Sequence, residues 1–199
     1  MPNWCRNTIT LKHKDPAQID RAYRALQNET FLNEFLPVPP FRSMDHEPGL
    51  SDSEVENKRT AVDQENLDLY GAKDWYDWCV TNWGTKWDVG DREYTELFDA
   101  NTVTASFDSA WAPPRRAYEH LVSLGFEITA YYSEPGMCFC GKWTGDALGF
   151  QDDYREYDGE ASSTVRDVIG QELDDYFGIS EDMASMEQDH DEDQDEQNN

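Results

Sequence analysis

Lysine is scarce in this sequence, while acidic residues are plentiful. The 199 residues contain 16 Lys and Arg, of which six are Lys, against 42 Asp and Glu. The formal net charge is −26. Such a charge disfavours direct binding to nucleic-acid phosphates and to anionic membranes, and it favours a basic protein as partner.

Segments that would place the chain in or across a membrane are also lacking. No apolar run is long enough to span a bilayer. The first residues, Met1 to Lys14, lack the basic and apolar parts of a signal peptide. We therefore expect a cytoplasmic protein of the host cell, in which Cys5, Cys79, Cys138 and Cys140 are reduced.

Motifs that carry a known reaction or hold a known cofactor are absent as well. The sequence has neither a Walker-type phosphate loop nor a dinucleotide-binding glycine pattern. Nucleophilic catalysis needs a Ser or Cys with a nearby base, and none of the four His lies in a recognisable motif. We expect no cofactor and favour a protein that is not an enzyme.

The cysteines offer a weak candidate for a metal site. Cys138 and Cys140 alternate along one predicted strand and so share a face, and Cys5 lies on another strand. Structural zinc sites, however, usually pair Cys two to four residues apart with a second such pair or with His. We therefore favour thiols that are simply buried, since free Cys is among the most buried residue types.

Hydrophobic periodicity predicts the order of the elements. Alternation over residues 3–12 predicts a strand with Cys5, Asn7, Ile9 and Leu11 on its core face. Helices are predicted from Pro16, over part of residues 53–66, over 66–82 and after Pro114. Strands are predicted within 87–98 and over 102–108, 126–132 and 137–143.

This order predicts an α+β fold, a ferredoxin-like split βαβ sandwich with βα, a helical insertion and ββαββ. The domain would span residues 1–150, with its insertion at about 37–70. Residues 151–180 form an acidic extension whose amphipathic helix, 162–178, docks on the domain or on a partner. Residues 181–199 are expected to be a disordered acidic tail. Residues 152–199 carry a net charge of −16, and the remaining residues carry −10.

The segment Asn82-Trp83-Gly84-Thr85-Lys86-Trp87-Asp88 is the most unusual stretch, because it mixes large rings with charges around a glycine. In the interpretation that we favour it is packing: Trp83 and Trp87 close one end of the sandwich, Lys86 pairs with Asp88 or Glu134, and Asn82 binds backbone groups. In the alternative interpretation, Trp87, Trp111 and the turn at Glu134 line a pocket.

Four blocks of sequence carry a family resemblance: MPNWCRNTITL, NWGTKWD, FDSAWAPP and YYSEPGMCFCGKW. Together and in this order they resemble the YubB-type ferredoxin-like domain family of conjugative plasmids and phages, over about residues 1–145 apart from the insertion. The resemblance implies a ferredoxin-like fold without an iron–sulfur cluster and a mobile-element origin, but no activity. The motif residues that form the candidate site are Asn82, Trp83, Gly84, Thr85, Lys86, Trp87, Asp88, Trp111, Pro113, Pro114, Glu134, Pro135, Gly136 and Gly141.

These features predict a non-enzymatic accessory protein of a phage or plasmid that acts by protein–protein interaction. The sharpest form of this hypothesis is nucleic-acid mimicry, in which carboxylates meet the Lys and Arg of a host defence or DNA-binding protein. One alternative is a ligand-binding or enzymatic domain with a Trp-rich pocket near Trp87 and Glu134. Another is an acidic protein of a salt-adapted host or its virus.

Overall fold

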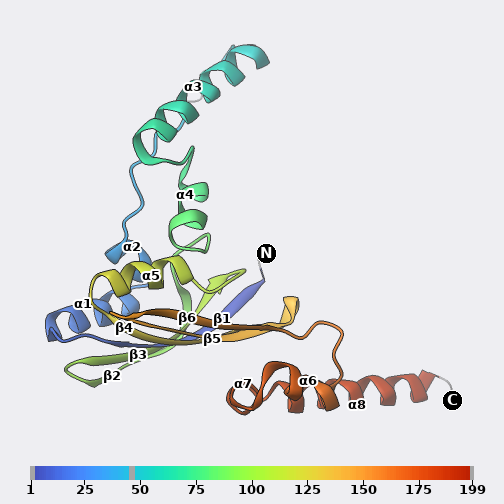
Figure 1. Cartoon of the computed structure of the whole chain (residues 1–199). Helices are drawn as coiled ribbons and strands as arrows, with labels where there is room; N and C mark the ends of the chain where they lie inside the picture. The colour runs from blue at the N-terminus through green and yellow to red at the C-terminus, as the bar shows by residue number, and fades with distance from the viewer. Residues whose placement is uncertain (1–2, 45–47, 198–199) are drawn as a thin grey trace.

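A six-stranded antiparallel sheet forms the centre of an α+β fold in the computed structural model, which describes residues 3–44 and 48–197 (Figure 1). Its spatial order is β2-β3-β1-β4-β5-β6. The strands are β1 (Trp4–Lys12), β2 (Gly90–Asp99), β3 (Thr102–Ala110), β4 (Glu127–Glu134), β5 (Phe139–Asp146) and β6 (Gly149–Glu156).

One face of the sheet is covered by α1 (Pro16–Gln27), α2 (Phe31–Phe35) and α5 (Arg115–Ser123) (Figure 1). Asp15 caps α1, with its side chain accepting a hydrogen bond from the Ala17 N–H. The predicted core face of β1 is confirmed, because Cys5, Asn7, Ile9 and Leu11 are all fully buried.

Asn7 is the polar member of that buried face, and its amide group is satisfied. Its Nδ2 donates to the Cys5 carbonyl and to Ser109 Oγ, each at 2.8 Å. Buried polar groups are tolerated when they are hydrogen-bonded in this way. The Asn7 side chain thereby links β1 to β3 inside the core.

The chain between α2 and β2 contains two helices, α3 (Asp52–Tyr70) and α4 (Trp75–Asn82), and α3 extends away from the sheet (Figure 1). The prediction of one helix over 66–82 is wrong. Gly71, at φ 74°, ends α3, and Asp74 caps α4 by accepting from the Asp77 N–H. The Asn66 side chain holds the base of α3, with Nδ2 donating to the carbonyls of Arg42 and Lys73.

The acidic extension returns to the domain as a strand and two short helices. β6 lies in a stretch for which the sequence predicted no strand, and it forms the sheet edge beside β5. The predicted helix over 162–178 is divided at Gly170 into α6 (Ser162–Ile169) and α7 (Gln171–Phe177). These helices lie on the other face of the sheet, so this segment docks on the domain (Figure 1).

A second apolar core holds these helices in place. It joins Cys140 of β5 and Tyr157 to apolar residues of the helices: Val165, Ile169, Leu173 and Ile179. The last helix, α8 (Ile179–Gln197), occupies the region where we expected a disordered tail. The structure differs because Ile179 and Met183 pack in this core and Glu187 accepts hydrogen bonds from the N–H and hydroxyl of Ser162.

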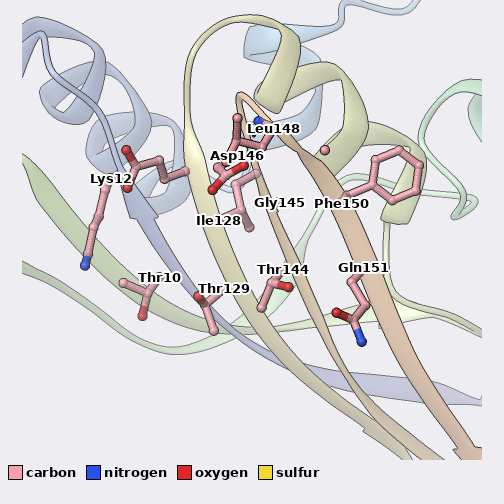
Figure 2. Close-up of a pocket in the computed structure, with 12 residues that line it drawn as sticks. Thr10, Lys12, Ile128, Thr129, Thr144, Gly145, Asp146, Leu148, Phe150 and Gln151 are labelled. Carbon is pink, nitrogen blue, oxygen red and sulfur yellow. Dashed lines mark hydrogen bonds between the residues drawn. The ribbon is translucent and has the colours of Figure 1, made fainter.

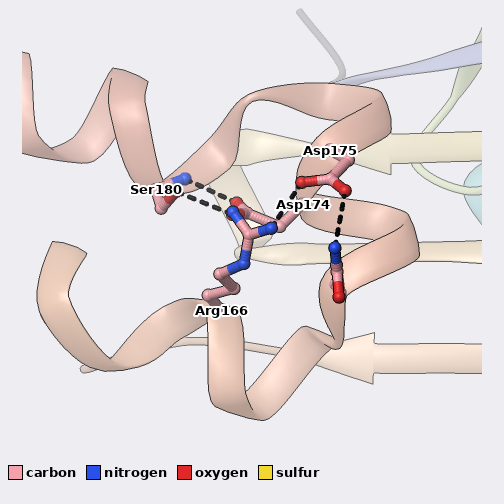
Figure 3. A network of polar contacts seen from close by, with 5 residues as sticks. Arg166, Asp174, Asp175 and Ser180 are labelled. Carbon is pink, nitrogen blue, oxygen red and sulfur yellow. Dashed lines mark hydrogen bonds and ion pairs between the residues drawn. The ribbon is translucent and has the colours of Figure 1, made fainter.

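A buried carboxylate connects the three C-terminal helices (Figure 3). The Asp174 side chain is only 2% exposed and forms an ion pair with Arg166 of α6. It also accepts hydrogen bonds from the Ser180 N–H and hydroxyl at the start of α8. Each of its oxygens is therefore satisfied, as a buried charge requires.

Among the residues that the structure describes, no helix has the length and apolarity needed to cross a membrane.

Candidate binding site

The segment 82–88 connects α4 to the sheet through backbone contacts. Trp83 is 3% exposed, and its Nε1 donates to the Leu36 carbonyl at 2.9 Å. Its own carbonyl accepts from the Ala117 N–H of α5, and Thr85 Oγ1 donates to the Ala110 carbonyl. Gly84, at φ 86°, makes the turn between them, where a Cβ would lie 3.4 Å from the N atoms of Arg115 and Arg116.

Asp88 binds backbone groups and not Lys86. Its carboxylate accepts from the N–H groups of Leu32, Asn33 and Val89, at 2.8 to 2.9 Å. Burial raises the pKa of Asp88, and these three hydrogen bonds oppose that rise. Among the described ion pairs, none joins Lys86 to Asp88 or Glu134, so that predicted pairing is wrong.

Lys86 lies among aromatic rings instead. Its Nζ is 4.2 Å from the centroid of the Trp87 ring, 5.5 Å from that of Tyr76 and 5.6 Å from that of Trp111. A cation above aromatic faces is stabilised by the ring quadrupoles without any carboxylate. This explains how Lys86 is held in a protein with many free carboxylates elsewhere on its surface.

These rings belong to a continuous exposed set that we call the aromatic ridge: Trp4, Trp75, Tyr76, Trp87 and Trp111. Neighbouring rings along it have centroids 6.1 to 6.5 Å apart. Each side chain is between 37% and 45% exposed. Contiguous exposed apolar surface of this kind marks an interaction site more often than scattered apolar residues do.

A cavity of about 660 Å³ opens beside the ridge, and we call it the aromatic pocket. Its lining combines rings and carboxylates: Asn3, Trp111, Gly136, Met137, Phe139, Tyr154, Glu156 and Asp158. Trp111 was predicted to line a pocket, and it does. The turn at Glu134, which was predicted with it, contributes Gly136 to the lining, whereas Trp87 and the Glu134 side chain are not among the lining residues.

The remaining motif residues shape the surroundings of this pocket. Glu134 is buried and accepts from the Gly136 N–H, while Pro135 is exposed in the short turn η1 (Pro135–Met137). Asn82 Nδ2 donates to the Trp78 carbonyl. Pro113 and Pro114 are buried where α5 begins, and their carbonyls accept from the N–H groups of Arg115 and Tyr118.

Gly141 is required by a polar contact on β5. A Cβ at this position would lie 2.3 Å from the hydroxyl oxygen of Tyr132. That hydroxyl donates to Asp152 of β6 at 2.5 Å, and Arg115 donates to the other oxygen of Asp152 at 2.6 Å. Glycine therefore leaves the space in which β6 is joined to β4 and α5.

Two residues in the left-handed backbone region lie beside the aromatic pocket. Trp111 has φ 67° and Cys138 has φ 51°. The Trp111 N–H donates to the Asn3 carbonyl, which fixes this conformation. A bulky residue with positive φ is uncommon and costs free energy, and such strain clusters at functional sites.

The weak candidate for a three-thiol metal site is wrong. Cys5 lies in the first core and Cys140 in the second, on opposite faces of the sheet. No group of three potential ligands capable of holding a metal occurs within residues 3–44 and 48–197. Burial raises the pKa of Cys79 to about 11 and that of Cys140 to about 12, and it raises that of Cys5 further.

A second cavity, of about 450 Å³, lies at the other end of the sheet (Figure 2). Thr10, Thr129, Thr144 and Gln151 form a row across adjacent strands there. Lys12, Glu127 and Asp146 add charges at its rim. Hydroxyl groups with no nearby His or Cys offer hydrogen bonds but no activated nucleophile.

Two His side chains, those of His13 and His120, are hydrogen-bond partners of backbone groups. His13 contacts the carbonyls of Asp15 and Leu124, and His120 contacts that of Phe35. The aromatic pocket, which is lined by ring faces and carboxylates, is suited to binding a ligand.

Sequence reasoning missed Tyr154, Glu156 and Asp158 as members of the site. All three come from β6 or the turn after it, which the sequence analysis placed in an irregular acidic extension. The available signal was the turn sequence Asp146 to Gly149, followed by an alternation that puts Phe150, Asp152 and Tyr154 on one face.

Comparison with known proteins gives one remote structural likeness. No family model matches the chain. No curated protein matches it either. The crystal structure of the protein api92 from Yersinia pseudotuberculosis, of family model DUF1281, is similar with a TM-score of 0.45 and 12% sequence identity. The match covers 79% of this chain and 98% of that one.

Proposed function

We propose that this protein is a non-enzymatic binding protein that engages a basic protein partner through its carboxylates. The observation that carries the proposal is the placement of the acidic residues. Many exposed acidic residues lie outside both apolar cores, on elements that project from the sheet or form its edge.

Helix α3 is one such element. Its exposed carboxylates include Asp52, Glu54, Glu56, Glu65 and Asp68, and within the helix only Asn66 is buried. Even its Leu67 and Leu69 side chains are exposed, so the helix has no buried apolar face along its length. An acidic arm of this kind is suited to meeting Lys and Arg side chains on another molecule.

The sheet edge and the C-terminal helices present a second set of carboxylates. Exposed acidic residues follow one another from β6 into α8: Glu156, Asp158, Asp167, Glu172, Asp175, Glu181, Asp182, Glu187 and Asp189. Residues 152–199 carry −16 of the net −26. The field of such a surface accelerates association with a basic partner and depends on salt.

We further propose nucleic-acid mimicry against a host defence or DNA-binding protein, in the cytoplasm of a host cell. The net charge of −26 supports this proposal. The resemblance of four sequence blocks to the YubB-type family supports a mobile-element origin. The strand order β4-β1-β3-β2, with α1 and α5 on one face, supports a ferredoxin-like domain extended by β5 and β6.

A competition pull-down tests this function. The full chain is immobilised and exposed to bacterial lysate with and without added duplex DNA. We expect capture of a nucleic-acid-binding protein, loss of that capture with DNA, and steep weakening as salt rises. If no such protein is recovered, or if duplex DNA does not compete, mimicry is wrong.

A further inference from the structure

The aromatic pocket is the cavity whose lining specifies a ligand most narrowly. Its lining includes the aromatic residues Trp111, Phe139 and Tyr154 and the acidic residues Glu156 and Asp158. We infer that it binds an arginine side chain of the basic protein partner. This inference rests on the proposed function and assigns its contact point.

The rings supply the stacking surface that a guanidinium prefers. The centroids of Phe139 and Tyr154 are 5.3 Å apart, so these two rings form one continuous wall. Arginine stacks on aromatic faces because its guanidinium is planar and weakly hydrated. The protein itself shows this affinity, since the Arg115 guanidinium lies 5.7 Å from the centroid of the Tyr154 ring.

The carboxylates supply the charge that a cation needs. Glu156 and Asp158 are both exposed, and the Tyr154 hydroxyl donates to Glu156 at 2.7 Å, which orients that carboxylate beside the ring wall. No Lys or Arg is among the residues that line the pocket. A carboxylate can accept two parallel N–H groups from arginine, which a lysine cannot offer.

The pocket is also formed in advance of binding. The Trp111 backbone is held at φ 67° by its hydrogen bond to Asn3. At Gly136, a Cβ would lie 2.9 Å from both Asn3 Nδ2 and Glu134 Oε1, so only glycine leaves this wall undisturbed. A preformed site spends little binding free energy on ordering its side chains. Its volume exceeds one side chain and leaves space for the flanking peptide.

A peptide titration tests the inference independently of any lysate. Acetylated, amidated Gly-Gly-Arg-Gly-Gly is titrated into the full chain and followed by NMR, with matched peptides that carry Lys or Gln in place of Arg. We expect shifts at the pocket residues with Arg, about 3- to 10-fold weaker binding with Lys, and no shifts with Gln.

Two variants and two matched controls define the site. Trp111→Gly removes a ring while accepting the positive φ, and Glu156→Gln/Asp158→Asn removes both charges. Each should weaken the binding of the Arg peptide about 5- to 20-fold. Phe98→Leu and Glu96→Gln/Asp99→Asn change exposed residues of β2, at the opposite edge of the sheet, and should leave its affinity within about 2-fold.

The outcomes separate this inference from the proposed function. Loss of affinity in the pocket variants alone supports the inference. Equal loss in the two charge variants would show attraction by the whole acidic surface, which overturns the pocket and leaves the proposed function standing. Absence of any shift with the Arg peptide overturns the pocket as well, whatever the pull-down recovers.

Discussion

Single side chains in this protein have specific tasks that their residue types explain. Asn7 binds two strands inside the core, Asp88 accepts three backbone N–H groups, and Gly141 leaves room for the Tyr132 hydroxyl. Each of these positions belongs to one of the four sequence blocks. The blocks therefore contain residues with a structural purpose, whatever the function of the surface around them.

The cysteines should differ sharply in reactivity. The thiolate is the reactive form, and burial raises the pKa of Cys5, Cys79 and Cys140 while also hiding the sulfur. Only Cys138 is partly exposed, and its pKa is also raised. With Ellman's reagent at neutral pH we expect one thiol to react slowly, and the other three only after denaturation. Fast reaction of two or more thiols in the native protein would contradict the structure.

Replacing Asp88 should loosen the contact between the segment 82–88 and α2. Asp88→Ala leaves the N–H groups of Leu32 and Asn33 without their acceptor, which should cost about 1–2 kcal/mol in the free energy of unfolding. Chemical denaturation measures this cost. As a control, Asp68→Ala on the exposed helix α3 should change stability by less than about 0.5 kcal/mol. Equal effects of the two substitutions would show that Asp88 does not stabilise this contact.

At the scale of elements, the C-terminal helices are attached by polar contacts as well as by the second core. Glu172 of α7 contacts Lys142 and the Tyr131 hydroxyl, and the rings of Tyr131 and Tyr176 stack with centroids 4.0 Å apart. These contacts join α7 to strands β4 and β5. The attachment of the helices should therefore respond to acid.

The hydrogen bonds from Lys142 and Tyr131 lower the pKa of Glu172 from its ordinary value of 4.5. A lowered folded-state pKa contributes stability above the unfolded value, and that contribution is lost as the pH falls through the folded value. We expect the protection of α7 amides against hydrogen exchange, relative to the intrinsic exchange rate at each pH, to fall below about pH 4.5 in the wild type. Glu172→Gln should show faster exchange already at neutral pH and a weaker dependence on pH. An unchanged profile in this variant would assign the attachment to the apolar core alone.

Sequence patterns predicted the elements that have one apolar and one polar face. The alternation in β1 and the cap at Asp15 are confirmed by burial and by a hydrogen bond. The edge strand β6 was missed because its residues are exposed or half-buried on both faces, so its alternation at Phe150, Asp152 and Tyr154 does not separate apolar from polar residues. The helix α8 was missed because its acidic composition is typical of disorder, while its apolar anchors in the second core are Ile179 and Met183.

The candidate site was predictable only in part, because part of it lies on the strand β6 that the sequence patterns did not predict. Trp111 and Gly136 were recognised within their sequence blocks, and both line the aromatic pocket. Tyr154 and Glu156 of the unpredicted strand β6, and Asp158 of the turn after it, also line the pocket. Lys86 was predicted to pair with a carboxylate because a Lys close to an Asp in the sequence usually forms an ion pair. Its contact with three aromatic rings depends on tertiary packing, which the sequence pattern does not show.

For the whole molecule, the dependence of stability on salt would distinguish a binding protein from a salt-adapted one. The carboxylates of α3 and of the C-terminal helices lie outside two closed apolar cores, so their repulsion is spread over projecting elements. We expect a cooperative thermal transition even near 0.01 M salt, where the Debye length is about 30 Å. A chain that is unfolded there and folds only near about 1 M KCl would instead be salt-adapted.

The central claim is that the acidic surface occupies the nucleic-acid-binding surface of a basic partner. The most direct measurement uses the partner recovered by pull-down, bound to a fluorescent DNA duplex, and follows anisotropy as this protein is added. We predict complete displacement of the duplex, with an affinity that falls steeply as salt rises. A stable ternary complex, in which the partner binds the duplex and this protein at the same time, would contradict nucleic-acid mimicry.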